Sequence, residues 1–215
     1  MSLENKIRES IKELRSNSKN RKFNQSIELV INLRDIDMKK PEGRIQEAIE
    51  LPHPIGKKVG ICVFADGDMA LRARRSGADL VLERSEIESL TNDKKKQRQL
   101  ARGIDSFIAM ASLMPLVGRV FGSILGPRGK MPTPVPPTGD IEKEIERHRR
   151  MVLARTRGQP IIQCRVGTET MSDDELLENI ITVLGRVEGR LKRGIKNIMS
   201  IYLKTSMGSP IKVKI

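Results

Sequence analysis

The stretch VGICVFADGDMALRARRSGADLVL, residues 59–82, decides the fold class of this chain. It opens with a continuous β-prone run, Val59 to Phe64, and closes with a second apolar run, Asp79 to Leu82. Between the two runs, residues 68–75 have the pattern of a short helix. Uninterrupted apolar strands are typical of parallel sheets that are covered by helices on both faces. The stretch therefore predicts a strand, a helix and a second, parallel strand.

The same alternation continues toward the C-terminus. A longer helix is expected over Ser85 to Arg102 and a third apolar strand over Ser106 to Met110, and a charged helix, Ile141 to Arg157, closes the series. We expect residues 57–156 to form a Rossmann-like domain of three α/β/α layers.

The segments on either side of this domain predict a second α/β domain. Residues 1–56 offer one amphipathic helix and two strands, too little to fold alone, so we expect them to join residues 157–215 in a discontinuous two-layer domain. Both crossings between the domains are rich in Gly or Pro, which favours a hinge. The predicted elements are a helix over 3–14, strands over 26–33, 44–51, 161–166, 198–203 and 211–215, and a helix that begins with a capping box at Ser172 and Glu175 and ends at Gly194.

A glycine- and proline-rich segment, SLMPLVGRVFGSILGPRGKMPTPVPP, covers residues 112–137. Its glycines at 118, 122 and 126 would share one face of a helix, which predicts close packing against another element. The following residues, Gly126 to Pro132, predict a stiff turn that holds Arg128 and Lys130 outward.

This segment also carries a family resemblance. Met114-Pro-Leu-Val-Gly118, Leu125-Gly-Pro-Arg-Gly129 and Met131-Pro132 resemble the signature of the large-subunit ribosomal protein L-one family, and Lys130 with residues 133–136 resembles its archaeal branch. The resemblance extends over nearly the whole chain. It implies a structural protein of the ribosome, in the cytoplasm, that binds rRNA to form the mobile stalk near the tRNA exit site. It also implies help in releasing deacylated tRNA and, in many members, repression of translation by binding the protein's own mRNA.

Composition agrees with a nucleic-acid partner. The 215 residues include 40 Lys and Arg against 27 Asp and Glu, a formal charge of +13, which favours a polyanion. The longest uncharged run, Ser106 to Gly118, is too short to span a membrane, and no secretory signal follows Met1, so we expect a protein without membrane contact. With only four Phe, one Tyr and no Trp, folded RNA is a better partner than single strands that stack on aromatic side chains.

Two places in the discontinuous domain are candidate RNA contacts. Lys22 and Phe23 precede its first strand, and the residues Thr205, Ser206, Met207 and Gly208 turn between its last two. The residues alone leave Phe23 open as a core aromatic and the turn open as an ordinary hairpin. The resemblance implies that both places contact rRNA, with Ser206 where the family usually has Thr.

The resemblance implies further contacts at Ser26 and Glu28 on the first strand and at Arg165 and Thr168 on the strand after the second crossing. In the inserted domain, Arg128 and Lys130 are candidates for a second contact with RNA or tRNA. We expect the protein to be a monomer away from the ribosome.

A nucleotide-dependent enzyme that uses the inserted domain is the alternative. The fingerprint G-x-G-x-x-G is absent after the first parallel strand, where Asp66 and Asp68 stand instead, and a P-loop fails at Ile124 and Met131. Two cysteines and two histidines offer no zinc spacing. Although Asp66 and Asp68 could hold Mg²⁺, carboxylates are common at helix N-termini, so we expect no cofactor, no metal and no catalysis.

Overall fold

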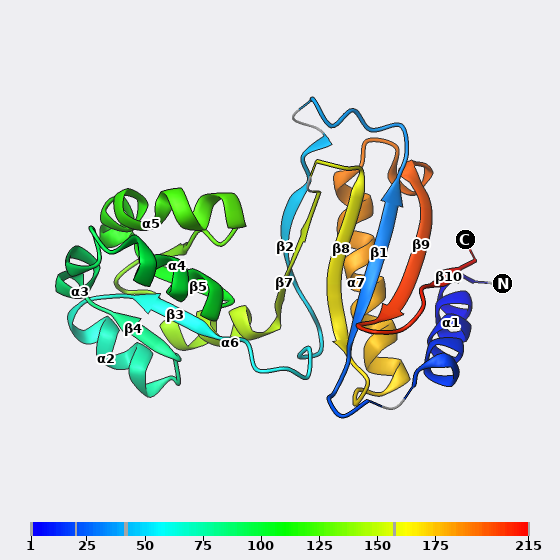
Figure 1. The fold of residues 1–215 in the computed structure, drawn as a ribbon, viewed down its shortest axis with the longest axis horizontal. Helices are drawn as coiled ribbons and strands as arrows, with labels where there is room; N and C mark the ends of the chain where they lie inside the picture. The colour runs from blue at the N-terminus through cyan, green and yellow to red at the C-terminus, as the bar shows by residue number, and fades with distance from the viewer. Residues whose placement is uncertain (1, 20, 41–42, 157, 215) are drawn as a thin grey trace. The chain divides into compact units, whose positions relative to one another are not determined.

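The computed structural model describes residues 2–19, 21–40, 43–156 and 158–214. These residues form a mixed α/β structure with both parallel and antiparallel strands, as the sequence predicted (Figure 1). The chain divides into two compact units, Met1–Lys57 with Arg150–Ile215, and Lys58–Arg149. Each unit is described by itself below.

The main sheet of the first unit combines strands from both ends of the chain. Its order is β10-β9-β1-β8, and every pairing is antiparallel. Strand β1 lies between β8 and β9, so a segment near the N-terminus pairs on both sides with segments near the C-terminus (Figure 1). The strands are β1 Ser26–Leu33, β8 Ile161–Thr168, β9 Ile198–Thr205 and β10 Ile211–Val213.

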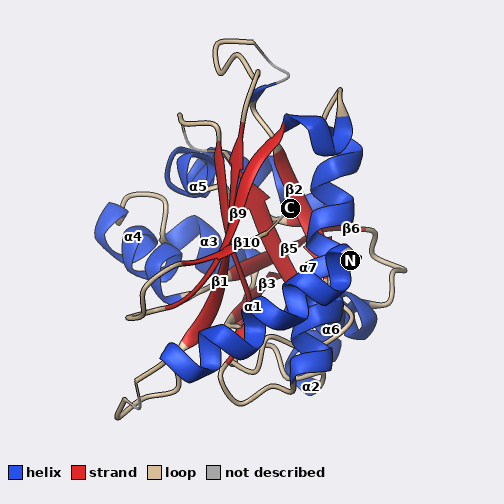
Figure 2. Ribbon diagram, turned by 90° about the vertical axis from the view of Figure 1, so that its right-hand side faces the viewer, coloured by secondary structure: helices blue, strands red, loops and turns tan. Residues whose placement is uncertain are grey.

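Two helices cover one face of this sheet. Helix α1, Leu3–Asn17, packs against α7, Asp173–Arg190, and against β9 and β10 (Figure 2). The alternation along β1 buries Ile27, Leu29 and Ile31 beneath these helices and turns the residues between them to the other face. The capping box of Ser172 and Glu175 is present as predicted. Gly194 does not end α7; the helix stops at Arg190, and Gly194 opens the 3₁₀ turn η3, Gly194–Asn197.

The first unit also contains a small sheet of two antiparallel strands, β2 Gln46–Glu50 and β7 Met151–Arg155. The sequence predicted helix through Arg157, which lies outside the described residues, and that prediction was wrong for residues 151–156, because α6 is Ile141–Arg150. Residues 151–155 alternate between buried and half-buried, which suits a strand, and β2 supplies their hydrogen-bonding partner. The second crossing between the units consequently falls at Arg149 and Arg150 and not after Thr156.

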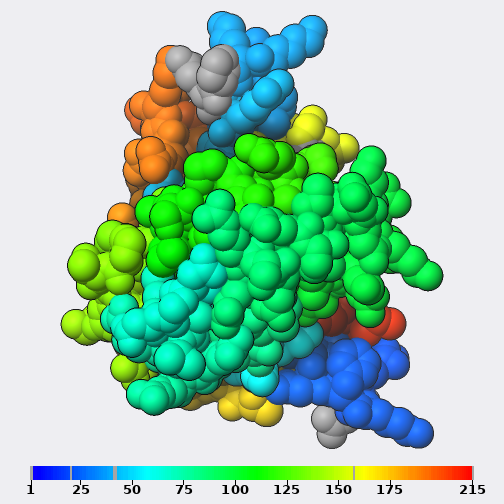
Figure 3. Space-filling view, turned by 90° about the vertical axis from the view of Figure 1, so that its left-hand side faces the viewer, coloured from blue at the N-terminus to red at the C-terminus, as the bar shows by residue number. Residues whose placement is uncertain are grey.

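The second unit is built on a parallel sheet of order β4-β3-β5-β6. Separate apolar clusters fill its two faces, one including residues of α2 and α6 and the other residues of α3, α4 and α5. Figure 3 shows its surface, from cyan residues after Lys58 to green residues of α5. Its other elements are β3 Ile61–Phe64, α2 Gly67–Arg75, β4 Leu80–Leu82, α3 Arg84–Ser89, α4 Lys94–Gly103, β5 Ser106–Met110, η2 Ala111–Leu113, α5 Met114–Arg128 and β6 Thr133–Val135.

Two sequence expectations about this unit were wrong in detail. The helix expected over Ser85 to Arg102 is broken into α3 and α4, because the Asp93 side chain accepts the Lys96 N–H and starts a new helix. Strand β6 was not expected at all; its Pro134 is tolerated because β6 lies at the edge of the sheet. Across the described residues, every helix is too short or too polar to cross a bilayer.

The glycine-rich helix α5 also differs from its prediction. A Cβ atom added at Gly118, Gly122 or Gly126 would meet nothing within 4 Å, so these glycines do not admit a neighbouring element within the described chain. The helix continues through Arg128 and ends at Gly129, whose φ of 68° is the left-handed conformation that glycine adopts without strain.

Candidate nucleic-acid interface

The start of β1 and the turn after β9 lie side by side. The Ser206 N–H donates to the Ser26 carbonyl oxygen at 3.0 Å, and the Ser26 N–H donates to Ser206 Oγ at 3.2 Å. These bonds continue the ladder in which Ile27 faces Thr205. The first unit therefore brings together the two candidate contact segments, which lie at opposite ends of the sequence.

A buried glutamine connects the two segments. Gln25 is only 1% exposed, and its Oε1 accepts the Met207 N–H at 3.1 Å. Its Nε2 donates to Glu169 Oε1 at 2.9 Å, and its backbone N–H donates to Glu169 Oε2 at 3.2 Å. Sequence reasoning missed both Gln25 and Glu169, because neither belongs to a motif and the two lie 144 positions apart.

Around this buried contact, three candidate side chains are exposed. Phe23 is 53% exposed and Met207 is 63% exposed, and Lys22 is exposed beside Phe23. Phe23 is therefore not a core aromatic, which was the alternative that the sequence left open. Large apolar side chains that remain exposed beside a cation suit a binding surface better than a fold-stabilising role.

Thr168 and Thr205 do not belong to this surface, because each is only 2% exposed. Thr205 pairs with the buried Ile27 and therefore turns inward. Thr168 follows an irregularity in the pairing of β8 with β1 and lies opposite Ser26, but Gly56 covers it: a Cβ atom added at Gly56 would lie 2.5 Å from Thr168 Oγ1. Thr205 has a structural role beside Gly208, where an added Cβ would lie 2.3 Å from Thr205 Oγ1. Gly208 is needed for this close approach, and its N–H donates to the Thr205 carbonyl at 3.2 Å.

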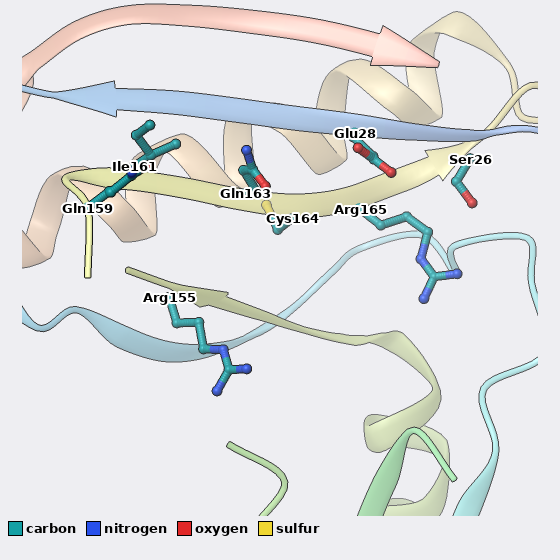
Figure 4. Close-up of a pocket in the computed structure, with 8 residues that line it drawn as sticks. All are labelled: Ser26, Glu28, Arg155, Gln159, Ile161, Gln163, Cys164 and Arg165. Carbon is teal, nitrogen blue, oxygen red and sulfur yellow. The ribbon is translucent and has the colours of Figure 1, made fainter. Parts of the chain in front are cut away.

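The outer face of the main sheet extends the candidate surface. Glu28 lies opposite Arg165 on β8 and opposite Lys204 on β9. Ser26, Glu28 and Arg165 line a groove of about 440 Å³ together with Arg155 on β7 (Figure 4). The sequence did not identify the groove's other lining residues, Gln159, Ile161, Gln163 and Cys164. Burial raises the pKa of the Cys164 thiol to about 12, so the thiol stays protonated and unreactive at neutral pH.

The second pair of candidates, in the other unit, is placed differently from the expectation. Lys130 does not point outward, because its ammonium donates to the carbonyl oxygens of Ala101, at 3.1 Å, and Ile104. It thereby binds the C-terminal end of α4, where helix carbonyls lack partners. Partial burial lowers the pKa of Lys130. Arg128 ends α5 and makes a long contact, 3.5 Å, with the Ile124 carbonyl.

Comparison with known proteins identifies the family. A profile of the Ribosomal protein L1p/L10e family matches residues 14–209. The chain belongs to this family. Among its relatives, each named large ribosomal subunit protein uL1, that of Hyperthermus butylicus is 44% identical, over 97% of this chain and 96% of the relative. That of Thermofilum pendens is 46% identical, over 96% of this chain and 92% of the relative. That of Pyrococcus abyssi is also 46% identical, over 97% of this chain and 95% of the relative.

Membership of the L1p/L10e family confirms the resemblance seen in the sequence, including its archaeal character. It makes the chain a structural ribosomal protein and not an enzyme, working in the cytoplasm as part of the ribosome. The nucleotide-dependent enzyme is therefore discarded.

Asp66 and Asp68, the two carboxylates considered above as Mg²⁺ ligands, both have partners within this L1p/L10e protein. Asp66 Oδ1 accepts the Arg84 N–H at 2.8 Å, which ties the start of α2 to the start of α3. Asp68 forms an ion pair with Arg72 at 2.9 Å, one turn along α2. Within the described residues, no three His, Cys, Asp or Glu side chains gather as a metal site.

Proposed function

We propose that the first unit binds the stalk rRNA of the large subunit through Lys22, Phe23, Ser206 and Met207. The observation that carries this proposal is that buried Gln25 links the turn to the start of β1, and that Met207, which it binds, and Phe23, two residues before it, are both exposed. Such a surface is fixed before RNA arrives, so little conformational entropy is lost on binding.

Each side chain has a distinct task in this proposal. The Phe23 ring stacks on a sugar or base, and Lys22 neutralises a phosphate. Ser206 keeps the hydroxyl of the family's usual threonine; its oxygen accepts the Ser26 N–H at 3.2 Å and has a further lone pair for a ribose 2′-hydroxyl. Glu28 and Arg165 extend the contact along the outer face of the sheet.

The burial of the other aromatic residues favours folded RNA over a single strand. Phe64, Phe107 and Phe121 are buried in the core of the second unit, where the Phe64 ring packs against the other two. Phe23 is the one exposed phenylalanine within the described chain. A protein with so few stacking surfaces is suited to RNA that presents a rigid backbone and a shallow minor groove.

We further propose that the two units act as two domains, close to the division expected at residues 57–156. The chain passes between them twice, at Lys57–Lys58 and Arg149–Arg150, and these links serve as a hinge about which the second unit swings to help release tRNA from the exit site. A net charge of +13 keeps free copies apart, so the protein is monomeric off the ribosome. Binding of a similar fold in its own mRNA would repress its synthesis.

Titration of a stalk rRNA fragment tests the RNA surface. Phe23→Ala and Met207→Ala should each weaken binding by about 1–3 kcal/mol while leaving the melting temperature nearly unchanged, because both side chains are exposed. Leu71→Ala is the matched control, since Leu71 is 52% exposed but belongs to the second unit. Equal affinities for all four proteins, wild type included, would refute the proposal.

Two further experiments test the proposed mRNA and tRNA partners. Competition between the rRNA fragment and the leader of the protein's own mRNA should occur at one site and be lost together in Phe23→Ala. Deacylated tRNA should change the scattering curve or interdomain distance of a stalk complex; a tRNA that alters neither would refute the hinge.

A further inference from the structure

We propose that Glu169 is a positioning residue of the RNA surface, orienting Gln25 so that the turn at Met207 is held beside Phe23. The inference rests on the proposed function and goes beyond it, because Glu169 touches neither of the exposed side chains and lies on the loop after β8. In this proposal the buried hydrogen bond between Gln25 and Glu169 contributes to RNA binding without contacting RNA.

The geometry around the carboxylate is complete. Glu169 Oε1 accepts the Ser18 hydroxyl at 2.5 Å and Gln25 Nε2 at 2.9 Å, and Oε2 accepts the Gln25 N–H at 3.2 Å. The Glu169 N–H in turn donates to the Gln25 carbonyl at 3.1 Å. Arg15 holds the Glu169 main chain by donating to its carbonyl oxygen at 2.8 Å. The carboxylate is thus fixed from both its backbone and its side chain.

This arrangement decides which way the Gln25 amide faces. A carboxylate and a main-chain carbonyl can only accept hydrogen bonds, so Gln25 must present its NH₂ group to Glu169, at 2.9 Å, and to the Lys19 carbonyl oxygen, at 3.3 Å. The amide oxygen then faces the opposite way, where it accepts the Met207 N–H at 3.1 Å. If the amide were reversed, its NH₂ group would meet the N–H of Met207, donor against donor, and the link to the turn would be lost.

A positioning role for Glu169 and a simple charge effect predict opposite changes in RNA affinity when the acid is removed. Glu169 forms no ion pair with any described residue, and it lies near a surface proposed to bind a polyanion. If Glu169 were only a nearby charge, Glu169→Gln would tighten RNA binding. If Glu169 positions Gln25, the same substitution replaces one of the two acceptor oxygens by an NH₂ group, which then faces either the Gln25 NH₂ group or the Gln25 main-chain N–H, donor against donor, and weakens binding. The sign of the effect therefore separates the two roles.

The experiment is a titration of the stalk rRNA fragment with full-length variants. We expect E169Q to bind about tenfold more weakly, the loss of roughly one well-made hydrogen bond. The slope of affinity against salt should be unchanged, because no phosphate contact is removed. E13Q is the matched control, since it removes the same charge from exposed Glu13 on α1, and it should bind as tightly as wild type or slightly more tightly.

Hydrogen exchange of the Met207 amide provides a second readout. In E169Q this amide should exchange faster than in wild type, because Gln25 Oε1 no longer holds its N–H in place. Unchanged exchange of the Met207 amide in E169Q would overturn the positioning role.

The outcomes separate this inference from the proposed function. If Phe23→Ala weakens binding but E169Q binds as tightly as wild type or more tightly, the positioning role is refuted while the RNA surface stands. If Phe23→Ala has no effect, the proposed function itself fails. Should E169Q unfold, Gln25→Met removes the same link to Met207 and leaves the acid in place, with its Oε1 still bonded to the Ser18 hydroxyl and its Oε2 to the main-chain N–H of residue 25. Unaltered RNA affinity of that variant would equally overturn the inference.

Discussion

The glycines of helix α5 test whether open space around a residue can be turned into stability. Three glycines lower the helix propensity of α5, and none of them makes room for a neighbouring element in the described chain. Gly122 lies in the middle of the helix Met114–Arg128, and a Cβ atom added there meets nothing within 4 Å. Glycine in a helix interior is about 0.8–1.0 kcal/mol less favourable than alanine. Gly122→Ala should therefore stabilise the second unit by about 1 kcal/mol, partly by restricting the unfolded chain.

Urea denaturation followed by circular dichroism is the assay. The transition of the second unit should move to higher urea with an unchanged m-value, since the surface exposed on unfolding stays the same. Gly118→Ala has equally open surroundings, so the double variant should gain about 2 kcal/mol if the two sites are independent.

Gly167→Ala on β8 is the opposite case. Its added Cβ would lie 2.5 Å from Leu176 Cδ2 and 2.7 Å from Met171 Sδ, so the first unit should lose about 1–3 kcal/mol. A Gly122→Ala variant that is no more stable than wild type would show that α5 packs against something in the free protein, and the reasoning from open space would be wrong.

Four further outcomes follow from particular contacts. Lys130→Met leaves the carbonyls of Ala101 and Ile104 without their donor and should destabilise the second unit by about 1–3 kcal/mol in urea; an unchanged midpoint would contradict the capping role. Burial lowers the pKa of His148, so below about pH 6.5 the unfolded chain binds a proton that the folded chain resists, and the free energy of unfolding should decrease as the pH is lowered. That decrease should be smaller in His148→Leu, and identical pH profiles of the two proteins would contradict a role of His148. Gly208→Ala should cost about 1–3 kcal/mol in folding and weaken rRNA binding, because its Cβ would overlap Thr205 Oγ1; full affinity in a filter-binding assay would disprove the close approach. Replacing residues 58–149 by a short linker should leave an rRNA-binding protein, whereas extending the deletion to Thr156 removes β7 and should lower its melting temperature.

Local patterns were enough for much of the fold. The apolar runs at Val59 to Phe64 and Ser106 to Met110 predicted a parallel sheet, and both lie in it. The alternation from Ser26 to Leu33 predicted β1 to the residue. The capping box at Ser172 and Glu175 predicted where α7 begins. These predictions succeeded because each depends on residues that are neighbours along the chain.

The errors arose where a distant partner decides the structure. Residues 151–155 read as the end of a charged helix, but pairing with β2, more than a hundred positions earlier, makes them a strand. Lys130 read as an outward cation because a loop of Gly and Pro is usually exposed, yet the unpaired carbonyls at the end of α4 bind its ammonium. Thr168 and Thr205 were chosen by resemblance, but pairing with buried Ile27 turns Thr205 inward and Gly56, more than a hundred positions earlier, covers Thr168.

The sequence by itself determined the family, the α/β class and the two segments that carry the proposed RNA contacts, because motifs, periodicity and charge are local properties. Only the tertiary structure decided that those segments adjoin, with Gln25 bound to Glu169, 144 positions away, and to Met207, 182 positions away. A hydrogen bond between residues so far apart leaves no trace in the order of amino acids, since it depends on how the folded backbone directs one amide toward a carboxylate and a main-chain N–H.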